Sequence, residues 1–123
     1  MTKIVIIEDE KEVRDILLET FSERSQFKVK AAGNGKDGFE LVKSMRPDVI
    51  LLDIKLTVQM DGVEVLRRIR GAGTPVKVIV ITGYADAAVE KRVREIGVEA
   101  FIEKPFEPPE IIQAVEKVLK QRG

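Results

Sequence analysis

Charged and hydroxyl-bearing side chains follow four separate apolar runs of this chain, each at the point where the run ends. In chain order they are Glu8-Asp9, Asp53, Thr82 and Lys104-Pro105. In an open parallel α/β sheet, ligands bind outside the carboxyl ends of the strands, so side chains far apart in the sequence can converge there. Carboxylates, a hydroxyl and a lysine are the groups needed to transfer a phosphoryl group onto an aspartate. The spacing therefore predicts a phosphoryl-transfer site centred on Asp53.

Acidic residues dominate the first of these positions, because Glu8, Asp9 and Glu10 are consecutive. Carboxylates brought within about 4 Å of one another repel by about 4 kcal/mol at an effective dielectric constant near 20, so a cluster either holds a proton or binds a cation. The chain has no His and no Cys, which leaves oxygen ligands, and these suit Mg²⁺ or Mn²⁺. Such an ion would neutralise the transferring group while Asp53 attacks and Lys104 adds a second positive charge.

Each of these residues also has a simpler interpretation. Asp9 or Glu10 could stabilise the positive end of a following helix. Asp53 could be a turn residue, Thr82 a helix cap and Lys104 a solvated charge. The occurrence of all of them together, one at each strand end, favours the phosphoryl-transfer interpretation.

Five apolar runs of strand length, each followed by a helical stretch, predict the fold. Strands are expected over 4–7, 27–32, 49–52, 76–81 and 100–102. This alternation predicts an α/β fold in which a five-stranded parallel, doubly wound sheet lies between two layers of helices. The first, third and fourth runs are continuously apolar and are expected to be central, whereas Lys28 and Lys30 alternate in the second and indicate an edge strand.

Length and charge restrict the class of protein. With 123 residues, the chain is expected to form one domain over residues 1–123. Its 21 basic and 21 acidic residues balance, so no basic field favours nucleic acid or an anionic membrane. No apolar run approaches the length of a membrane span, and no signal-peptide pattern occurs. We expect a cytoplasmic domain that binds neither nucleic acid nor membrane.

A glycine-rich segment offers a competing interpretation. Gly33 to Gly38 reads G-x-G-x-x-G and is followed twenty positions after Gly33 by the acid Asp53, which is a pattern of dinucleotide-binding folds. That fingerprint should follow a central, buried strand at a topological switch point. Here the preceding run carries Lys28 and Lys30, so we expect the glycines to serve as turn and helix-entry residues.

The chain resembles the receiver domains of response regulators, the phosphoacceptor modules of two-component signalling, over essentially its whole length. The resemblance implies a flavodoxin-like fold, as in the single-domain receivers of chemotaxis and sporulation relays. It also implies a phosphoryl donor, either a sensor histidine kinase or a histidine phosphotransfer protein, and a downstream protein target. The motifs that carry the resemblance are IVIIEDE at 4–10, DVILLD at 48–53, DG at 61–62, VIVITGY at 78–84 and AFIEKPF at 100–106.

By this resemblance, Asp53 is the phosphorylated residue, and Lys104 and Thr82 contact the phosphoryl group. The Lys104-Pro105 peptide bond is expected to be cis. The domain is expected to catalyse its own phosphorylation and dephosphorylation, as a signalling module rather than a conventional enzyme. The implied ligands of Mg²⁺ (or Mn²⁺) are Glu8, Asp9, Asp53 and the main-chain carbonyl of Lys55.

The resemblance also implies a switch. Thr82 and Phe101 would couple phosphorylation to the surface formed by the fourth helix, fifth strand and fifth helix, where the downstream protein would bind. Lys55 and Tyr84 would set the lifetime of the phosphoryl group. Leu18, off the main apolar stripe of the first helix, is either a kinase contact or an exposed leucine without a role.

Two departures from the family pattern leave alternatives open. Glu8-Asp9 stands where the family usually has two aspartates, which keeps the acid and is expected to preserve metal binding. The segment 56–62 is one residue longer than the usual turn. That longer loop supports a second hypothesis, a degenerate receiver that is not phosphorylated and acts as a protein-binding scaffold. A third possibility is a receiver fragment of a longer transcriptional regulator.

Overall fold

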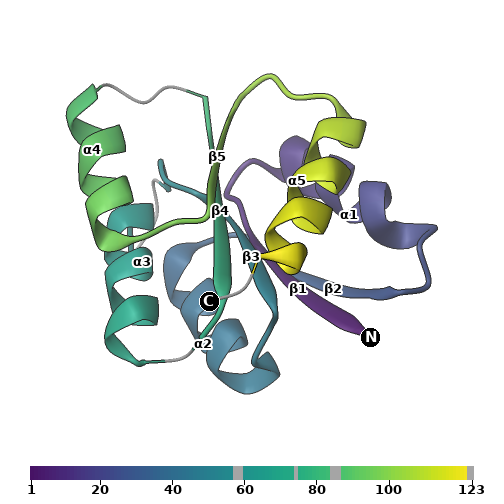
Figure 1. Ribbon diagram of the computed structural model, residues 1–123, viewed down its shortest axis with the longest axis horizontal. Helices are drawn as coiled ribbons and strands as arrows, with labels where there is room; N and C mark the ends of the chain where they lie inside the picture. The colour runs from purple at the N-terminus through teal and green to yellow at the C-terminus, as the bar shows by residue number, and fades with distance from the viewer. Residues whose placement is uncertain (57–59, 74, 84–86, 122–123) are drawn as a thin grey trace.

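Strands and helices alternate along the chain (Figure 1). The computed structural model describes residues 1–56, 60–73, 75–83 and 87–121. The strands are β1 (Thr2–Ile7), β2 (Phe27–Ala32), β3 (Val49–Asp53), β4 (Lys77–Thr82) and β5 (Ala100–Glu103). The helices are α1 (Lys11–Ser22), α2 (Gly35–Met45), α3 (Gly62–Gly71), α4 (Ala87–Ile96) and α5 (Pro108–Lys120).

The five strands form one parallel sheet in the order β2-β1-β3-β4-β5. Figure 1 shows α1 and α5 on one face of this sheet and α2, α3 and α4 on the other. The predicted doubly wound, flavodoxin-like sandwich is confirmed, with β1, β3 and β4 in the centre and β2 at an edge. The lysines that alternate in β2 are exposed, as an edge strand allows.

Alternate side chains of the central strands fill two separate cores. Ile4 and Ile6 of β1 pack with the α1 and α5 side chains, whereas Val5 and Ile7 pack with those of α2, α3 and α4. Successive residues of a strand point to opposite faces, so a strand covered on both sides must be apolar throughout. All four of these side chains are fully buried, which explains the continuous apolar runs in the sequence.

The first helix corrects one detail of the sequence interpretation. Leu18 packs partly buried against the core between α1 and α5, whereas Ile16 is 46% exposed. Leu18 lies three positions before Phe21 and so shares its helix face, while Ile16 lies five positions before it and faces away. Leu18 therefore has a packing role, and Ile16 is the exposed apolar residue of this helix.

The carboxyl ends of three strands lie one residue beyond the sequence prediction, at Asp53, Thr82 and Glu103. Asp53 and Thr82 are the last residues of β3 and β4, where the sequence placed them just after these strands. Each has a parallel partner on the neighbouring strand, Ile81 for Asp53 and Glu103 for Thr82. The backbone that carries both side chains is thus held by the sheet.

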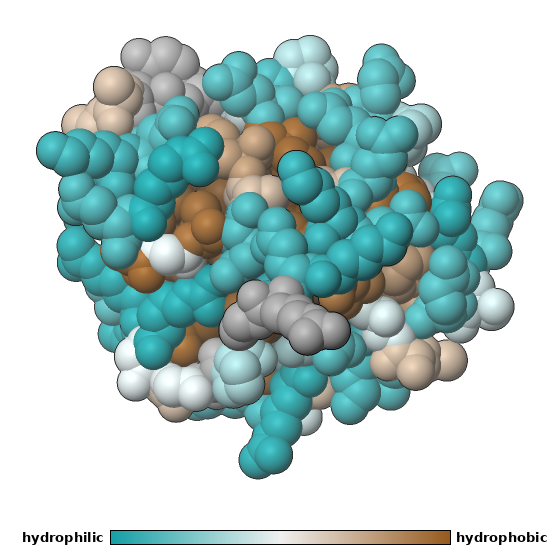
Figure 2. All heavy atoms as spheres, viewed as in Figure 1, coloured by the Kyte–Doolittle hydropathy of each residue, from teal (hydrophilic) through white to brown (hydrophobic). Residues whose placement is uncertain are grey.

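The face of the molecule seen in Figure 2 is mostly hydrophilic. Figure 2 shows hydrophilic residues over most of the visible face, with hydrophobic side chains in narrow seams between them. Among the described helices, none is long and apolar enough to span a membrane.

Candidate functional site

The side chains singled out in the sequence meet at the carboxyl edge of the sheet. Glu8 follows β1, Asp53 and Thr82 end β3 and β4, and Lys104 follows β5. Three polar side chains at this edge are almost inaccessible to solvent, with exposures of 1% for Glu8, 3% for Asp53 and 0% for Thr82. Buried polar and charged groups are costly unless they are paired. Their concentration at one edge therefore marks this place as the candidate site.

Lys104 is the central cation of the site. Its Nζ lies 2.7 Å from Glu8 Oε1, 3.0 Å from Glu10 Oε1 and 3.3 Å from Asp53 Oδ2. The Lys104 amide donates a hydrogen bond to the Thr82 carbonyl at 2.8 Å, which ties the start of the loop to the end of β4. The Lys104-Pro105 bond that follows is cis, as predicted.

Four carboxylates surround this lysine. Glu8, Asp9, Glu10 and Asp53 can each place one oxygen within 4.8 Å of the others. If all four are ionised, one ammonium group leaves a formal excess of three negative charges. Glu8 Oε1 is buried and accepts no hydrogen bond within the described residues, since its approach to Lys104 lacks hydrogen-bond geometry. A buried oxygen without a hydrogen bond, in an oxygen-only donor set, fits a hard divalent cation such as Mg²⁺.

Burial decides the protonation of this cluster. The pKa of Glu8 is raised from 4.5 to about 7, chiefly because burial desolvates the carboxylate; Lys104 lowers this pKa and the nearby Asp53 raises it. Burial lowers the pKa of Lys104, but the neighbouring carboxylates of Glu8, Glu10 and Asp53 outweigh this and raise that pKa above its ordinary value. The lysine thus stays charged at neutral pH, where Glu8 is close to half-protonated.

Main-chain groups fix the orientation of the buried carboxylates. The Lys55 amide donates to Asp53 Oδ1 at 2.9 Å, and the Glu10 amide donates to Glu8 Oε2 at 3.1 Å. Arg14 donates to the Glu8 carbonyl at 2.9 Å. With Oδ1 held by the backbone, the other oxygen of Asp53 faces Lys104. This arrangement leaves Asp53 preorganised beside a positive charge, as a nucleophile in phosphoryl transfer requires.

Gly62 explains the Asp-Gly motif next to the site. A Cβ atom at this position would lie 2.5 Å from Ile54 Cα and 2.6 Å from the Asp53 carbonyl oxygen. Asp61 caps the helix, since its Oδ1 accepts from the Glu64 amide at 2.9 Å. The start of α3 can therefore approach the end of β3 closely only with glycine here.

The glycine-rich segment is a packing feature. A Cβ at Gly35 would collide with the main-chain carbonyl of Met60, and one at Gly38 would lie 2.7 Å from the side chain of Ile7. The space next to the first turn of α2 is thus occupied by atoms of Met60 and Ile7. The strand before this helix, β2, is an edge strand. The structure supports helix-entry and packing roles for these glycines, as expected, and removes the basis for the dinucleotide interpretation.

Glu10 belongs to the acidic run that was predicted to hold a proton or a cation, but not to the ligand set implied by the resemblance, and the structure brings it into contact with Lys104. The run of three consecutive acids was the only signal for it. Among the other predicted residues, Phe101 is half-buried, and the guanidinium carbon of Arg94 lies 5.4 Å from the centre of its ring. Tyr84 lies outside the described residues, and so do residues 57–59 of the 56–62 loop, which was predicted to be one residue longer than usual.

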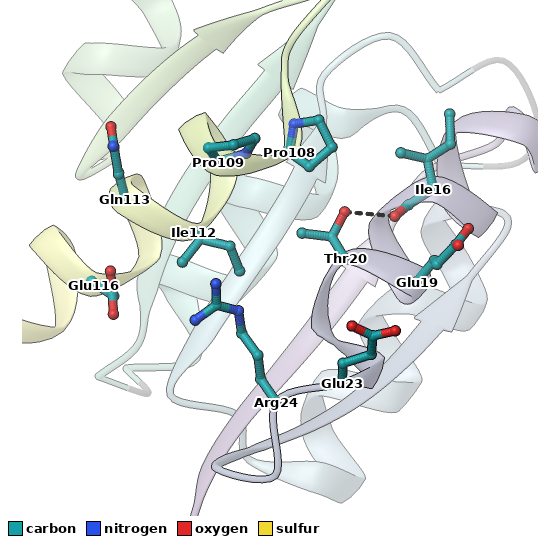
Figure 3. Close-up of a pocket in the computed structure, with 10 residues that line it drawn as sticks. All are labelled: Ile16, Glu19, Thr20, Glu23, Arg24, Pro108, Pro109, Ile112, Gln113 and Glu116. Atoms are coloured by element: carbon teal, nitrogen blue, oxygen red, sulfur yellow. Dashed lines mark hydrogen bonds between the residues drawn. The ribbon is translucent and has the colours of Figure 1, made fainter.

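One groove lies away from this site. It has a volume of about 640 Å³ and lies between α1 and α5, as Figure 3 shows. Ile16, Pro108 and Ile112 contribute apolar surface to it, and none of the four clustered carboxylates lines it. The candidate site at the sheet edge and this groove are therefore separate places on the molecule.

Comparisons with known proteins agree with this geometry. The family model "Response regulator receiver domain" matches residues 4–116. Sporulation initiation phosphotransferase F of Bacillus subtilis is 34% identical over 117 residues, which covers 95% of this chain and 93% of that protein. The polar-differentiation response regulator DivK of Brucella anthropi is 31% identical over 121 residues, covering 97% of this chain and 98% of the relative.

A solved structure shows the same fold. The CheY-like response regulator receiver domain protein of Methanospirillum hungatei superposes with a TM-score of 0.90 at 25% identity, covering 97% of this chain and 94% of that one. Five parallel strands in this order, five helices and an acid cluster beside a lysine at the carboxyl edge agree with the family match. The chain belongs to the response regulator receiver domain family of two-component systems.

Proposed function

We propose that this chain accepts a phosphoryl group on Asp53 from a phosphohistidine donor and thereby switches its binding to a partner protein. The observation that carries the proposal is the buried Asp53 carboxylate 3.3 Å from Lys104 Nζ, within a cluster of acids. The proposed receiver domain comprises residues 1–123 and acts in the cytoplasm. These 123 residues contain no His, so the donor histidine lies outside them, on a sensor histidine kinase or a histidine phosphotransfer protein.

The transfer needs a divalent cation. Glu8, Asp9, Asp53 and the main-chain carbonyl of Lys55 would hold Mg²⁺ or Mn²⁺, which neutralises charge on the transferring group when bound. The buried Glu8 oxygen that accepts no hydrogen bond supports this assignment. Glu8 is one methylene longer than the aspartate usual at this position, and it still reaches the other carboxylates.

The residues then have distinct roles in the reaction. A bond forms between an Asp53 carboxylate oxygen and phosphorus as the bond from phosphorus to the donor histidine nitrogen breaks. Lys104 pairs with the charge that spreads over the phosphoryl oxygens. Thr82 donates its hydroxyl to the bound phosphoryl group. Hydrolysis later returns Asp53 to its carboxylate, at a rate set by Lys55 and Tyr84.

Switching follows from the new contacts. A hydrogen bond to a charged group contributes about 1.5 to 3 kcal/mol, so contacts at Thr82 and Lys104 can together approach the roughly 5.5 kcal/mol that inverts a two-state ratio. Phe101 lies half-buried beside β4 and is positioned to respond. The downstream protein is proposed to bind the surface formed by α4, β5 and α5, and this domain contacts neither nucleic acid nor membrane.

The test is the intact mass of the protein after incubation with acetyl phosphate and Mg²⁺. We expect the mass of one phosphoryl group to be added, and we expect EDTA to abolish the addition. Asp53→Ala, which removes the acceptor carboxylate, should gain no mass. A folded wild-type protein that gains no mass would instead support the degenerate scaffold.

A further inference from the structure

Three carboxylates lie close to the Lys104 ammonium group, which donates hydrogen bonds to those of Glu10 and Asp53. The group has three N–H bonds, and three carboxylate oxygens lie within 3.3 Å of Nζ, those of Glu8, Glu10 and Asp53. Once Asp53 carries the phosphoryl group, its own carboxylate is acylated, so the phosphoryl oxygens compete for Lys104 with the carboxylates of Glu8 and Glu10. The question is which carboxylate can leave at the lowest free-energy cost.

The three carboxylates differ greatly in exposure. The Glu8 and Asp53 side chains are 2% and 3% exposed, whereas that of Glu10 is 64% exposed. A buried carboxylate that loses its cation stays desolvated, which is strongly unfavourable. An exposed carboxylate exchanges the cation for water at little cost. Glu10 is thus the partner that Lys104 can release.

The position of Glu10 in the fold supports this assignment. It precedes α1 as the N-terminal cap residue, but its side chain makes no capping hydrogen bond. Its Oε1 instead accepts a hydrogen bond from Lys104 Nζ, 94 positions away in the sequence. The Glu10 side chain therefore does not cap its own helix and instead contacts the lysine of the proposed site.

We infer that Glu10 is a positioning residue that occupies, on Lys104, the place that a phosphoryl oxygen takes, and that it moves into solvent when Asp53 is phosphorylated. This inference rests on the proposed function. Glu10 holds Lys104 over the cluster in the unphosphorylated state and competes with the phosphoryl group for the same cation. It should make the phosphorylated state less favourable than the other site residues alone would.

The test uses beryllofluoride, a phosphoryl analogue, titrated at a Mg²⁺ concentration that saturates each variant and followed by amide NMR shifts. Glu10→Ala is expected to lower the half-saturating beryllofluoride concentration about two- to fivefold, the range for loss of an exposed ion pair. Glu10→Gln keeps an acceptor without the charge and should give an intermediate value. Glu12→Ala, an exposed acid in the first turn of the same helix, should change the value less than twofold.

A second signal separates positioning from mere stability. The Lys104 side-chain NMR resonance in the free protein should shift in Glu10→Ala and stay unchanged in Glu12→Ala. Unchanged beryllofluoride affinity in Glu10→Ala, or weaker affinity, would overturn the inference while leaving the proposed function intact. If the wild-type protein binds no beryllofluoride and behaves like Asp53→Asn in this titration, both the inference and the proposed function would be overturned.

Discussion

Replacing Glu8 by glutamine should remove a pH dependence from the stability of this protein. Burial raises the pKa of Glu8 from 4.5 to about 7, so between these values the folded state binds more protons than the unfolded state. The contribution of Glu8 to the free energy of unfolding therefore falls as pH rises from about 4.5 to about 7. The shift corresponds to about 3 kcal/mol at full ionisation.

The measurement is urea denaturation of wild type and Glu8→Gln in EDTA at several pH values between 4.5 and 8. All other groups titrate in both proteins, so the difference between the two unfolding free energies isolates Glu8. That difference should move in favour of the variant by about 3 kcal/mol as the pH increases. Curves that stay parallel over this range would refute the assigned protonation. Mg²⁺ should flatten the wild-type dependence, because a bound cation favours the ionised carboxylate.

Three further substitutions test the packing of the fold and the role of Lys104. Arg70→Ala should destabilise the fold by about 1–3 kcal/mol in urea denaturation. The reason is that Arg70 donates hydrogen bonds to the carbonyls of Gly97 and Val76 and pairs with the carboxylate of Glu99 at 3.0 Å. The control Arg68→Ala, which removes an exposed ion pair, should cost under about 0.5 kcal/mol. Gly62→Ala should cost about 1–3 kcal/mol in the same assay through its clash with the end of β3, whereas Gly71→Ala, with open space around it, should be tolerated. Lys104→Met should slow phosphorylation by acetyl phosphate about 100-fold, measured by intact mass, and an unchanged rate would remove the lysine from the mechanism.

The fold could be predicted from the sequence because the pattern of apolar and charged residues in each strand reflects how far that strand is buried in the sheet. Continuous apolar runs identified β1, β3 and β4 as strands covered on both faces, and the alternating lysines of β2 identified an edge. Since all strands are parallel, residues at their carboxyl ends had to share one edge of the sheet. The convergence of Glu8, Asp53, Thr82 and Lys104 followed from this topology alone.

Finer features depend on tertiary packing and could not be predicted in this way. The apolar stripe of α1 includes Leu18 and excludes Ile16, because the orientation of the helix is set by where Phe21 and α5 meet. The contact between Glu10 and Lys104 joins residues 94 positions apart. No local pattern fixes the direction of an exposed glutamate, so its contact became visible only in the folded chain.

The most direct test of the central claim is the position of the phosphoryl group. An acyl phosphate is reduced by borohydride to an alcohol, which converts a phosphorylated aspartate to homoserine. After treatment with acetyl phosphate and Mg²⁺, reduction and proteolysis, mass spectrometry should find homoserine at position 53. Modification at Glu8, Asp9 or Glu10 in place of Asp53, or no modified carboxylate in folded protein, would contradict the account.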